Sequence, residues 1–258
     1  MMMAELIFKR DLTLRAPLMN AAGTLGFAPD SRLAVPWGDF GAFVTNPLSL
    51  RPRTPATHPR LLDYPGGLLL HSGLPNPGFP AALKKYAPRW ADADIPIIVN
   101  LMADRPEETA RMVQQLETVE NVMAVELGFA PGLADHIILR ALEKSLGELP
   151  IIVSLPWSQV LALGPQAMRA GAMAISLAAP RGALPGSQDE GSQSLVTGRL
   201  YGPSIFPQAL DVVRNAFRLG LPVIGGGGVY SRQNASDMLA AGARGVQVDA
   251  VLWRGDFA

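Results

Sequence analysis

The chain has 258 residues, of which 48% are hydrophobic and 17% are charged. This length fits one large domain with a sizeable core, since α/β barrels commonly reach this size undivided. Lys plus Arg and Asp plus Glu both number 22, so no net charge attracts nucleic acid or an anionic membrane surface. The absence of cysteine excludes disulfides, thiolate metal sites and a cysteine base.

The N-terminus does not have the pattern of a secretion signal. Within residues 1–10, Lys9 and Arg10 follow the apolar residues rather than precede them. No later segment offers about 18 uninterrupted apolar residues, the length that a membrane span needs. We therefore expect a cytoplasmic globular domain with no membrane partner.

Short β-branched runs recur along the chain, and several of them begin with proline. Such runs are typical of strands that are buried on both faces of a parallel sheet. Proline fits the first residue of a strand, where no ladder hydrogen bond is lost. The strands expected on this basis are residues 18–22, 42–45, 96–100, 123–127, 150–154, 174–177, 222–225 and 245–248.

Helical patterns lie between several of these strands. Residues 107–118 carry apolar side chains at helical spacing, and Pro106 fits a first helical turn. Residues 135–146, 207–219 and 232–240 read similarly. Regular alternation of strand and helix favours βαβ units that close into a (β/α)8 TIM barrel. A doubly wound open sheet is the alternative, because local patterns do not determine closure.

Two connections are too long for simple βα loops, and the last helix is expected to be reduced. Residues 46–94 and 178–205 each follow a predicted strand, so both should lie at the C-terminal face where barrel active sites form. Loops of this length usually serve as lids or binding segments, or are disordered. Only ten residues follow Val248, too few for a full eighth helix. We expect the N-terminal segment or a partner subunit to cover that flank.

An ordered set of motifs spans nearly the whole chain. The set comprises MNAAGTLG at 19–26, GAFVT at 41–45, LRPR at 50–53, PR at 59–60, PGG at 65–67, GLPNPG at 73–78, GRLYGPSI at 198–205, IGGGGV at 224–229, AGA at 241–243 and VQV at 246–248. In this order the motifs resemble the dihydroorotate dehydrogenases. The resemblance implies a barrel that binds FMN on its C-terminal rim. It also implies an oxidoreductase of pyrimidine biosynthesis, which uses a base and hydride transfer to the flavin.

The resemblance places an FMN site on the rim of the barrel. The four glycines at 225–228 could present backbone N–H groups to the phosphate, because glycine lets a ligand approach closely. The alternative is a tight strand-to-helix turn without a ligand. The implied cofactor-binding residues are Ala22, Gly23, Asn46, Asn100, Gly202, Gly227, Gly228, Asp249 and Ala250.

One of these positions departs from the family at the phosphate. The family has Gly-Thr after the eighth strand, where this chain has Asp249 and Ala250. A carboxylate beside a phosphate is repulsive unless Arg254 or another cation neutralises it.

Other polar groups that the family reaction needs are also replaced. The base lies in the loop after the fourth strand, but residues 126–132 read ELGFAPG, without hydroxyl, thiol or amide. The two family lysines align with Asn46 and Ser154, and the substrate asparagines align with Leu70 and with residues 179–180. Each lost donor weakens the binding of a polar substrate, so no catalytic residue is assigned.

The remaining candidate groups also have plain structural alternatives. His71 could act as an acid or base, because histidine titrates near neutrality, or it could be an ordinary loop histidine. Glu126 could be a functional carboxylate or part of the scaffold. Arg181, Arg199 and Arg254 follow predicted strands and could gather an anionic ligand, or they could be solvated. No histidines and carboxylates stand at metal-ligand spacing, so no metal site is predicted.

Three hypotheses for the function stay open at this point. The chain could be a flavoprotein acting on a CH–CH group, as its motif order suggests. It could be a non-catalytic barrel, kept as a subunit or as a small-ligand-binding protein, as the missing base and lysines suggest. It could also be a barrel enzyme with replaced chemistry. Assembly as a homo-oligomer or with a partner subunit is expected in each case.

Overall fold

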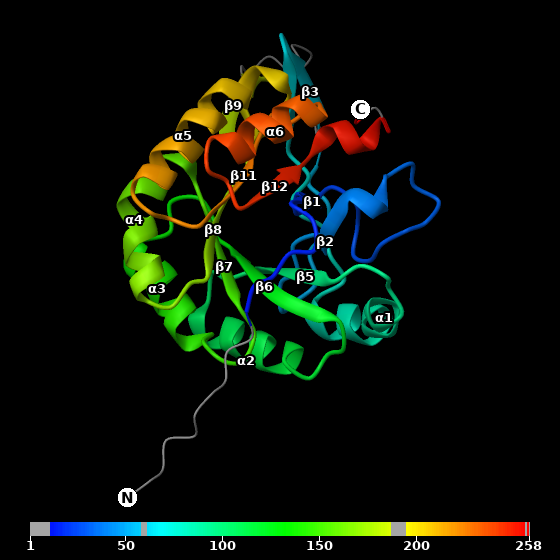
Figure 1. The fold of residues 1–258 in the computed structure, drawn as a ribbon. Coiled ribbons are helices and arrows are strands. Elements are labelled where there is room, and N and C mark those ends of the chain that lie inside the picture. The colour runs from blue at the N-terminus through cyan, green and yellow to red at the C-terminus, as the bar shows by residue number, and fades with distance from the viewer. Residues whose placement is uncertain (1–10, 58–60, 187–194, 256, 258) are drawn as a thin grey trace, which may run out of the picture.

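A computed structural model describes residues 11–57, 61–186, 195–255 and 257. His58, the PR motif at 59–60 and the first ten residues lie outside these ranges. Eight parallel strands form a closed barrel (Figure 1). The strands are β1 (Leu18–Asn20), β2 (Phe40–Val44), β5 (Ile97–Met102), β6 (Val122–Gly128), β7 (Ile151–Leu155), β8 (Ala174–Leu177), β11 (Val223–Gly226) and β12 (Gly245–Val248). Since β1 pairs with both β2 and β12, the predicted TIM barrel is confirmed and the open sheet is wrong.

Helices surround this barrel, as the ribbon in Figure 1 shows. Four of them match predicted segments: α2 (Pro106–Leu116), α3 (Asp135–Lys144), α5 (Phe206–Arg218) and α6 (Arg232–Ala240). Two were not predicted, α1 (Phe79–Ala91) and α4 (Trp157–Arg169). Each of these contains an internal proline, Pro88 or Pro165. Proline removes a helical hydrogen bond and normally marks a helix end, which hides both segments from pattern rules.

The two long connections form a separate antiparallel sheet. The first contributes β3 (Leu61–Tyr64) and β4 (Gly67–Leu70), and the second contributes β9 (Arg181–Pro185) and β10 (Leu195–Tyr201). Their order is β3-β4-β10-β9, so the two connections meet where β4 pairs with β10. Disorder is therefore excluded for the described parts of both connections, and their role as lids or binding segments stays a prediction. Because both connections leave the C-terminal ends of barrel strands, the sheet stands beside the rim.

The apolar core has two parts that lie on opposite faces of the barrel strands. The outer part fills the space between the strands and the surrounding helices. The inner part alternates with it along each strand, so it fills the barrel interior. Leu12 and Leu14, which precede β1, pack against the inner part. Its buried residues are Met19, Ala42, Val44, Ile98, Ala124, Ile152, Ala174 and Ile224.

The last helix is reduced to a 3-10 turn, η4 (Ala250–Trp253), as the short C-terminus predicted. The flank that it leaves is covered from within the described chain. Val35 of the β1–β2 connection is buried, and the ring of Phe257 packs on Phe40 with centroids 6.5 Å apart. The first ten residues lie outside the described ranges, so further cover by the N-terminal segment or by a partner subunit stays a prediction.

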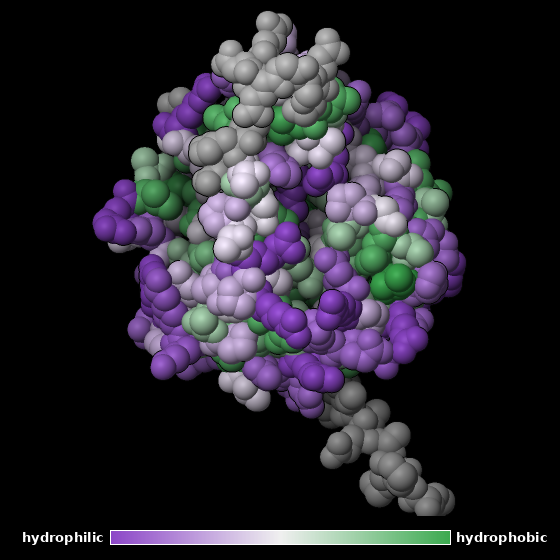
Figure 2. All heavy atoms as spheres, turned by 180° about the vertical axis from the view of Figure 1, so that it is seen from behind, coloured by the Kyte–Doolittle hydropathy of each residue, from purple (hydrophilic) through white to green (hydrophobic). Residues whose placement is uncertain are grey.

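The face of the molecule shown in Figure 2 is mostly hydrophilic, with hydrophobic residues gathered in separate small areas. Exposed large side chains include Leu195 on β10 and Phe217 at the end of α5. No helix in the described parts of the chain combines the length and hydrophobicity that a bilayer span requires.

Candidate functional site

Toward the C-terminal ends of the strands, the inward positions of the barrel become polar. Glu126 on β6 lies two residues beyond the apolar layer and is 1% exposed. Its Oε1 accepts hydrogen bonds from Ser176 Oγ at 2.5 Å and from Gln247 Nε2 at 2.8 Å. Its Oε2 accepts one from Asn100 Nδ2 at 2.8 Å. The carboxylate thus ties β5, β8 and β12 to β6, which supports the scaffold interpretation of Glu126.

The rim above β1 and β2 holds three of the predicted cofactor residues. Asn46 makes two hydrogen bonds with Gly26. Its side-chain Oδ1 accepts the Gly26 N–H at 3.1 Å, and its backbone N–H donates to the Gly26 carbonyl at 2.7 Å. Ala22 packs against the inner core. A Cβ at Gly23 would stand 3.7 Å from Nη1 of Arg199. An arginine side chain of the same protein therefore lies beside this predicted cofactor residue.

Arg199 belongs to a small cationic group at the edge of the rim. It donates to the hydroxyl of Tyr201, whose pKa is raised chiefly by burial. The Tyr201 ring packs against Trp253 with centroids 5.6 Å apart. Arg181 pairs opposite Arg199 in the β9–β10 ladder, and burial followed by the Arg199 charge lowers the pKa of Arg181. Within the described ranges no carboxylate forms an ion pair with either arginine.

The predicted phosphate site lies where β11 and β12 end side by side. Gly228 follows β11 with a φ of 71°, and Asp249 follows β12 directly. The Asp249 carboxylate accepts the N–H of Ala250 at 2.6 Å and also the N–H of Gly228. Asp249 is 4% exposed, and burial raises its pKa to about 6 against the effect of both backbone hydrogen bonds. The amides expected to bind phosphate hold a carboxylate of the chain itself.

The glycines near this site are required by the packing of the chain. A Cβ at Gly227 would stand 2.6 Å from Cζ2 of Trp157, and a Cβ at Gly228 would stand 2.6 Å from the backbone nitrogen of Phe206. Gly202 has a φ of 133°, and a Cβ there would meet the carbonyl of Gly66. These contacts support the reading of the glycine run as a tight turn.

Replacing Gly202 with alanine is expected to lower the free energy of unfolding by about 3 kcal/mol. The strain of a positive φ contributes about 1 kcal/mol, and the clash with the β3–β4 turn adds the rest. Gly132→Ala is the matched control, because Gly132 has a φ of 76° but no atom within 4 Å of its Cβ position. Urea unfolding of both variants measures the difference. Equal losses would show that the close approach at Gly202 contributes nothing.

The rim residues do not fit FMN. At the predicted phosphate position the N–H groups of Gly228 and Ala250 hold the Asp249 carboxylate, and Nη1 of Arg199 lies beside Gly23. Asn46 and Ser154, which the resemblance aligns with the family lysines, have neutral side chains. No step of a flavin reaction is therefore assigned to these residues.

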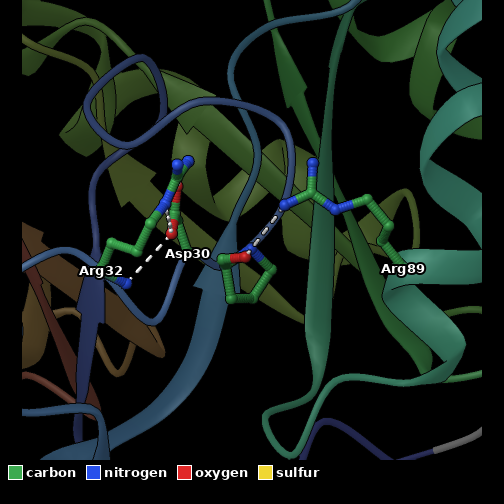
Figure 3. Close-up of polar contacts among 4 residues, drawn as sticks. Asp30, Arg32 and Arg89 are labelled. Atoms are coloured by element: carbon green, nitrogen blue, oxygen red, sulfur yellow. Dashed lines mark hydrogen bonds and ion pairs between the residues drawn. The ribbon is translucent and has the colours of Figure 1, made fainter.

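A surface cleft of about 470 Å³ lies to the side of the rim, between the β1–β2 connection, α1 and η4. Figure 3 shows the polar contacts of two residues that line it: Asp30 Oδ2 pairs with Arg32 Nη2 at 2.7 Å, and Arg89 donates to the carbonyl of Pro29 at 3.4 Å. Hydrogen bonding from Arg32 lowers the pKa of Asp30. None of the nine predicted cofactor residues lines this cleft, so it is distinct from the predicted FMN site.

The other candidate groups do not converge. Among the described residues, no hydrogen bond or ion pair joins Glu126 to His71 or to Arg254. No group of three or more histidines and carboxylates in the described chain could hold a metal ion. The arrangement gives no support to a barrel enzyme with chemistry rebuilt on these side chains.

Comparison with known proteins agrees with the geometry of the barrel. The family model for dihydroorotate dehydrogenase matches residues 6–135. The catalytic subunit of dihydroorotate dehydrogenase B (NAD(+)) from Trichlorobacter lovleyi is 32% identical over 254 residues, which cover 92% of this chain and 84% of that protein. The chain belongs to the dihydroorotate dehydrogenase family.

Two further relatives of the same name show the same extent of likeness. The protein from Desulforudis audaxviator is 30% identical over 256 residues, covering 92% of this chain and 83% of that protein. The protein from Pelobacter propionicus is 32% identical over 254 residues, covering 92% and 84%. The predicted resemblance is confirmed, and the chain is a dihydroorotate-dehydrogenase-like barrel. The roles of the nine rim residues within this family stay predictions.

Proposed function

We propose that this family member does not oxidise dihydroorotate, and that it serves as a non-catalytic barrel that binds a small anionic ligand. The observation that carries the proposal is the loop after β6. Residues 128–132 of this loop contain no side chain that can take a proton. Asp104 Oδ1 accepts the N–H of Ala130 at 2.7 Å and fixes the loop. A base must lie within hydrogen-bond reach of the proton that it removes, and this loop offers none.

The cations of the family reaction are missing as well. Asn46 is neutral, and its amide oxygen is already bonded to Gly26. Ser154 at the end of β7 is neutral too. A reduced flavin gains negative charge, which needs a nearby positive charge or preorganised donors. Neither residue can supply a positive charge at these two positions.

Arg199 and Arg181 support an anionic ligand. The guanidinium group offers donors in a fixed fork that matches a carboxylate, and its charge persists at any ordinary pH. The two arginines face each other across one ladder position at the edge of the rim. A small carboxylate would relieve the repulsion between them, which favours this ligand class over a neutral one.

A flavin oxidoreductase acting on another CH–CH substrate is the second candidate. The likeness to the relatives favours it, because it covers 92% of this chain. Those relatives are named as catalytic subunits, so we also propose that this chain assembles with a partner subunit or a second copy. The cytoplasm is the proposed location.

The test is dye reduction by dihydroorotate with purified protein and added FMN. We expect no rate above that of the dye with FMN alone, since base and cations are replaced. The catalytic subunit from Trichlorobacter lovleyi, assayed alongside, serves as the positive control. A protein concentration-dependent rate for this chain would overturn the proposal. Calorimetric titration of the wild type and of the Arg199→Gln variant with small dicarboxylates then tests whether the barrel binds an anionic ligand.

A further inference from the structure

A buried acid at the ends of β11 and β12 has no role in the proposed function. TIM barrels frequently bind phosphate between the loops after their seventh and eighth strands and the N-terminus of a short extra helix. In this chain these elements are Gly227 and Gly228 after β11, and η4 after β12. The Asp249 carboxylate accepts hydrogen bonds from the first N–H of η4 and from Gly228. A side chain therefore makes the contacts that a bound phosphate would make.

We propose that the Asp249 carboxylate is a built-in anion that occupies the phosphate site of this barrel and excludes phosphate monoesters from it. The N–H groups of Gly228 and Ala250 both donate to this carboxylate, so an entering phosphate finds these two donors engaged. Two anions at hydrogen-bond distance of the same amides repel each other strongly in a buried site. Hence Asp249 decides which ligand class the rim accepts.

Among the described residues, no lysine or arginine neutralises Asp249. The influences on its ionisation are burial and the two backbone N–H groups, without a contribution from lysine or arginine. Tyr201 and Tyr230 are the titratable side chains that respond to its charge, and burial keeps both of them neutral. A ligand phosphate would therefore meet an uncompensated negative charge.

The amides should keep their positions when the carboxylate is removed. Gly228 is fixed by its neighbours, since a Cβ there would stand 2.6 Å from Phe206 N and 2.9 Å from the carbonyl of Gly202. Preorganised donors bind an anion without a cost of ordering. A variant without the carboxylate should therefore contain a ready phosphate site. This inference holds whether or not the barrel catalyses a reaction.

The test is calorimetric titration of wild-type protein and of the Asp249→Gly and Asp249→Ser variants with inorganic phosphate at pH 7.5. We expect the dissociation constant for phosphate to fall at least tenfold in both variants. FMN and riboflavin, which differ by the phosphate, then separate a phosphate site from a flavin-ring site. The variants should prefer FMN to riboflavin, and the wild type should bind neither.

Glu120→Gln is the matched control. Glu120 is exposed, it lies before β6 at the opposite end of the barrel, and its replacement changes the net charge equally. Its affinity for phosphate should equal that of the wild type. Tight FMN binding by the wild type, or equal phosphate affinity in all four proteins, overturns the proposal. If the wild type binds FMN but does not oxidise dihydroorotate, the proposal of a built-in anion is refuted and the proposed function still stands.

A second measurement covers variants that fail to fold. Sulfate stays a dianion between pH 5 and pH 8, so its own charge does not change. We expect wild-type protein to bind sulfate at least threefold more tightly at pH 5, where Asp249 carries a proton for more of the time. Tyr201 and Tyr230 stay neutral over this range, because burial raises the pKa of both. Equal or weaker binding at pH 5 would contradict the proposal.

Discussion

Replacing Glu126 with leucine is expected to lower the free energy of unfolding by about 4 kcal/mol. The substitution leaves three buried donors, on Asn100, Ser176 and Gln247, without their acceptor. Each buried donor that loses its partner costs about 1–3 kcal/mol, and the three losses overlap because the side chains share one site. Urea unfolding monitored by circular dichroism measures the loss.

Glu126→Gln is the control for this prediction, because it conserves the shape of the side chain and one acceptor oxygen. The amide oxygen can still accept from Ser176 and Gln247, while a turn of the Asn100 amide provides an acceptor for the new NH₂ group. We expect a loss of about 1 kcal/mol for this variant. If the Glu126→Gln variant loses as much stability as the Glu126→Leu variant, the charge of Glu126 matters rather than its hydrogen bonds. A scaffold role alone would not explain that result.

The barrel could be predicted because its strands are buried on both faces. Residues 174–177 and 245–248 were predicted with the bounds that the structure gives them. Short, mainly apolar runs of this kind are typical of the buried strands of parallel sheets. The antiparallel sheet offered no such signal, since β3 and β9 alternate between exposed and partly exposed residues. Its pairing of β4 with β10 joins two distant connections, which no local pattern encodes.

The sequence predicts where the candidate site lies better than it predicts which contacts its side chains make. The motif order predicts the rim residues, and it predicts that Asp249 repels a neighbouring phosphate unless Arg254 or another cation neutralises it. The sequence could not show that this carboxylate bonds to Gly228, because the contact depends on closure of the barrel. Ser176 and Gln247 were missed as partners of Glu126, although each is a polar residue at an inward position of a buried run. Polar residues at inward positions of buried strands are a signal from which a polar layer around Glu126 could be predicted.

As the pH rises, the free energy of unfolding of the wild type is expected to fall by about 3 kcal/mol relative to that of the Asp249→Asn variant. Burial raises the pKa of Asp249 from 3.8 to about 6 in the folded protein. Between these values the folded state holds the proton more tightly than the unfolded state, so stability decreases as the pH rises. One pKa unit corresponds to about 1.4 kcal/mol, which gives about 3 kcal/mol in total. The loss is complete above about pH 6, where the folded carboxyl ionises as well.

Urea unfolding of both proteins at half-unit steps from pH 4 to pH 8 measures this difference. Tyr201 and Tyr230 do not ionise in that range, and other groups titrate equally in the two proteins, so the difference isolates Asp249. Glu120→Gln should follow the wild type, because Glu120 is exposed. A difference that stays constant with pH would mean that the carboxylate is as well solvated in the fold as in water. The two backbone N–H groups would then offset the whole effect of burial, and the prediction that burial raises the pKa of Asp249 would be wrong.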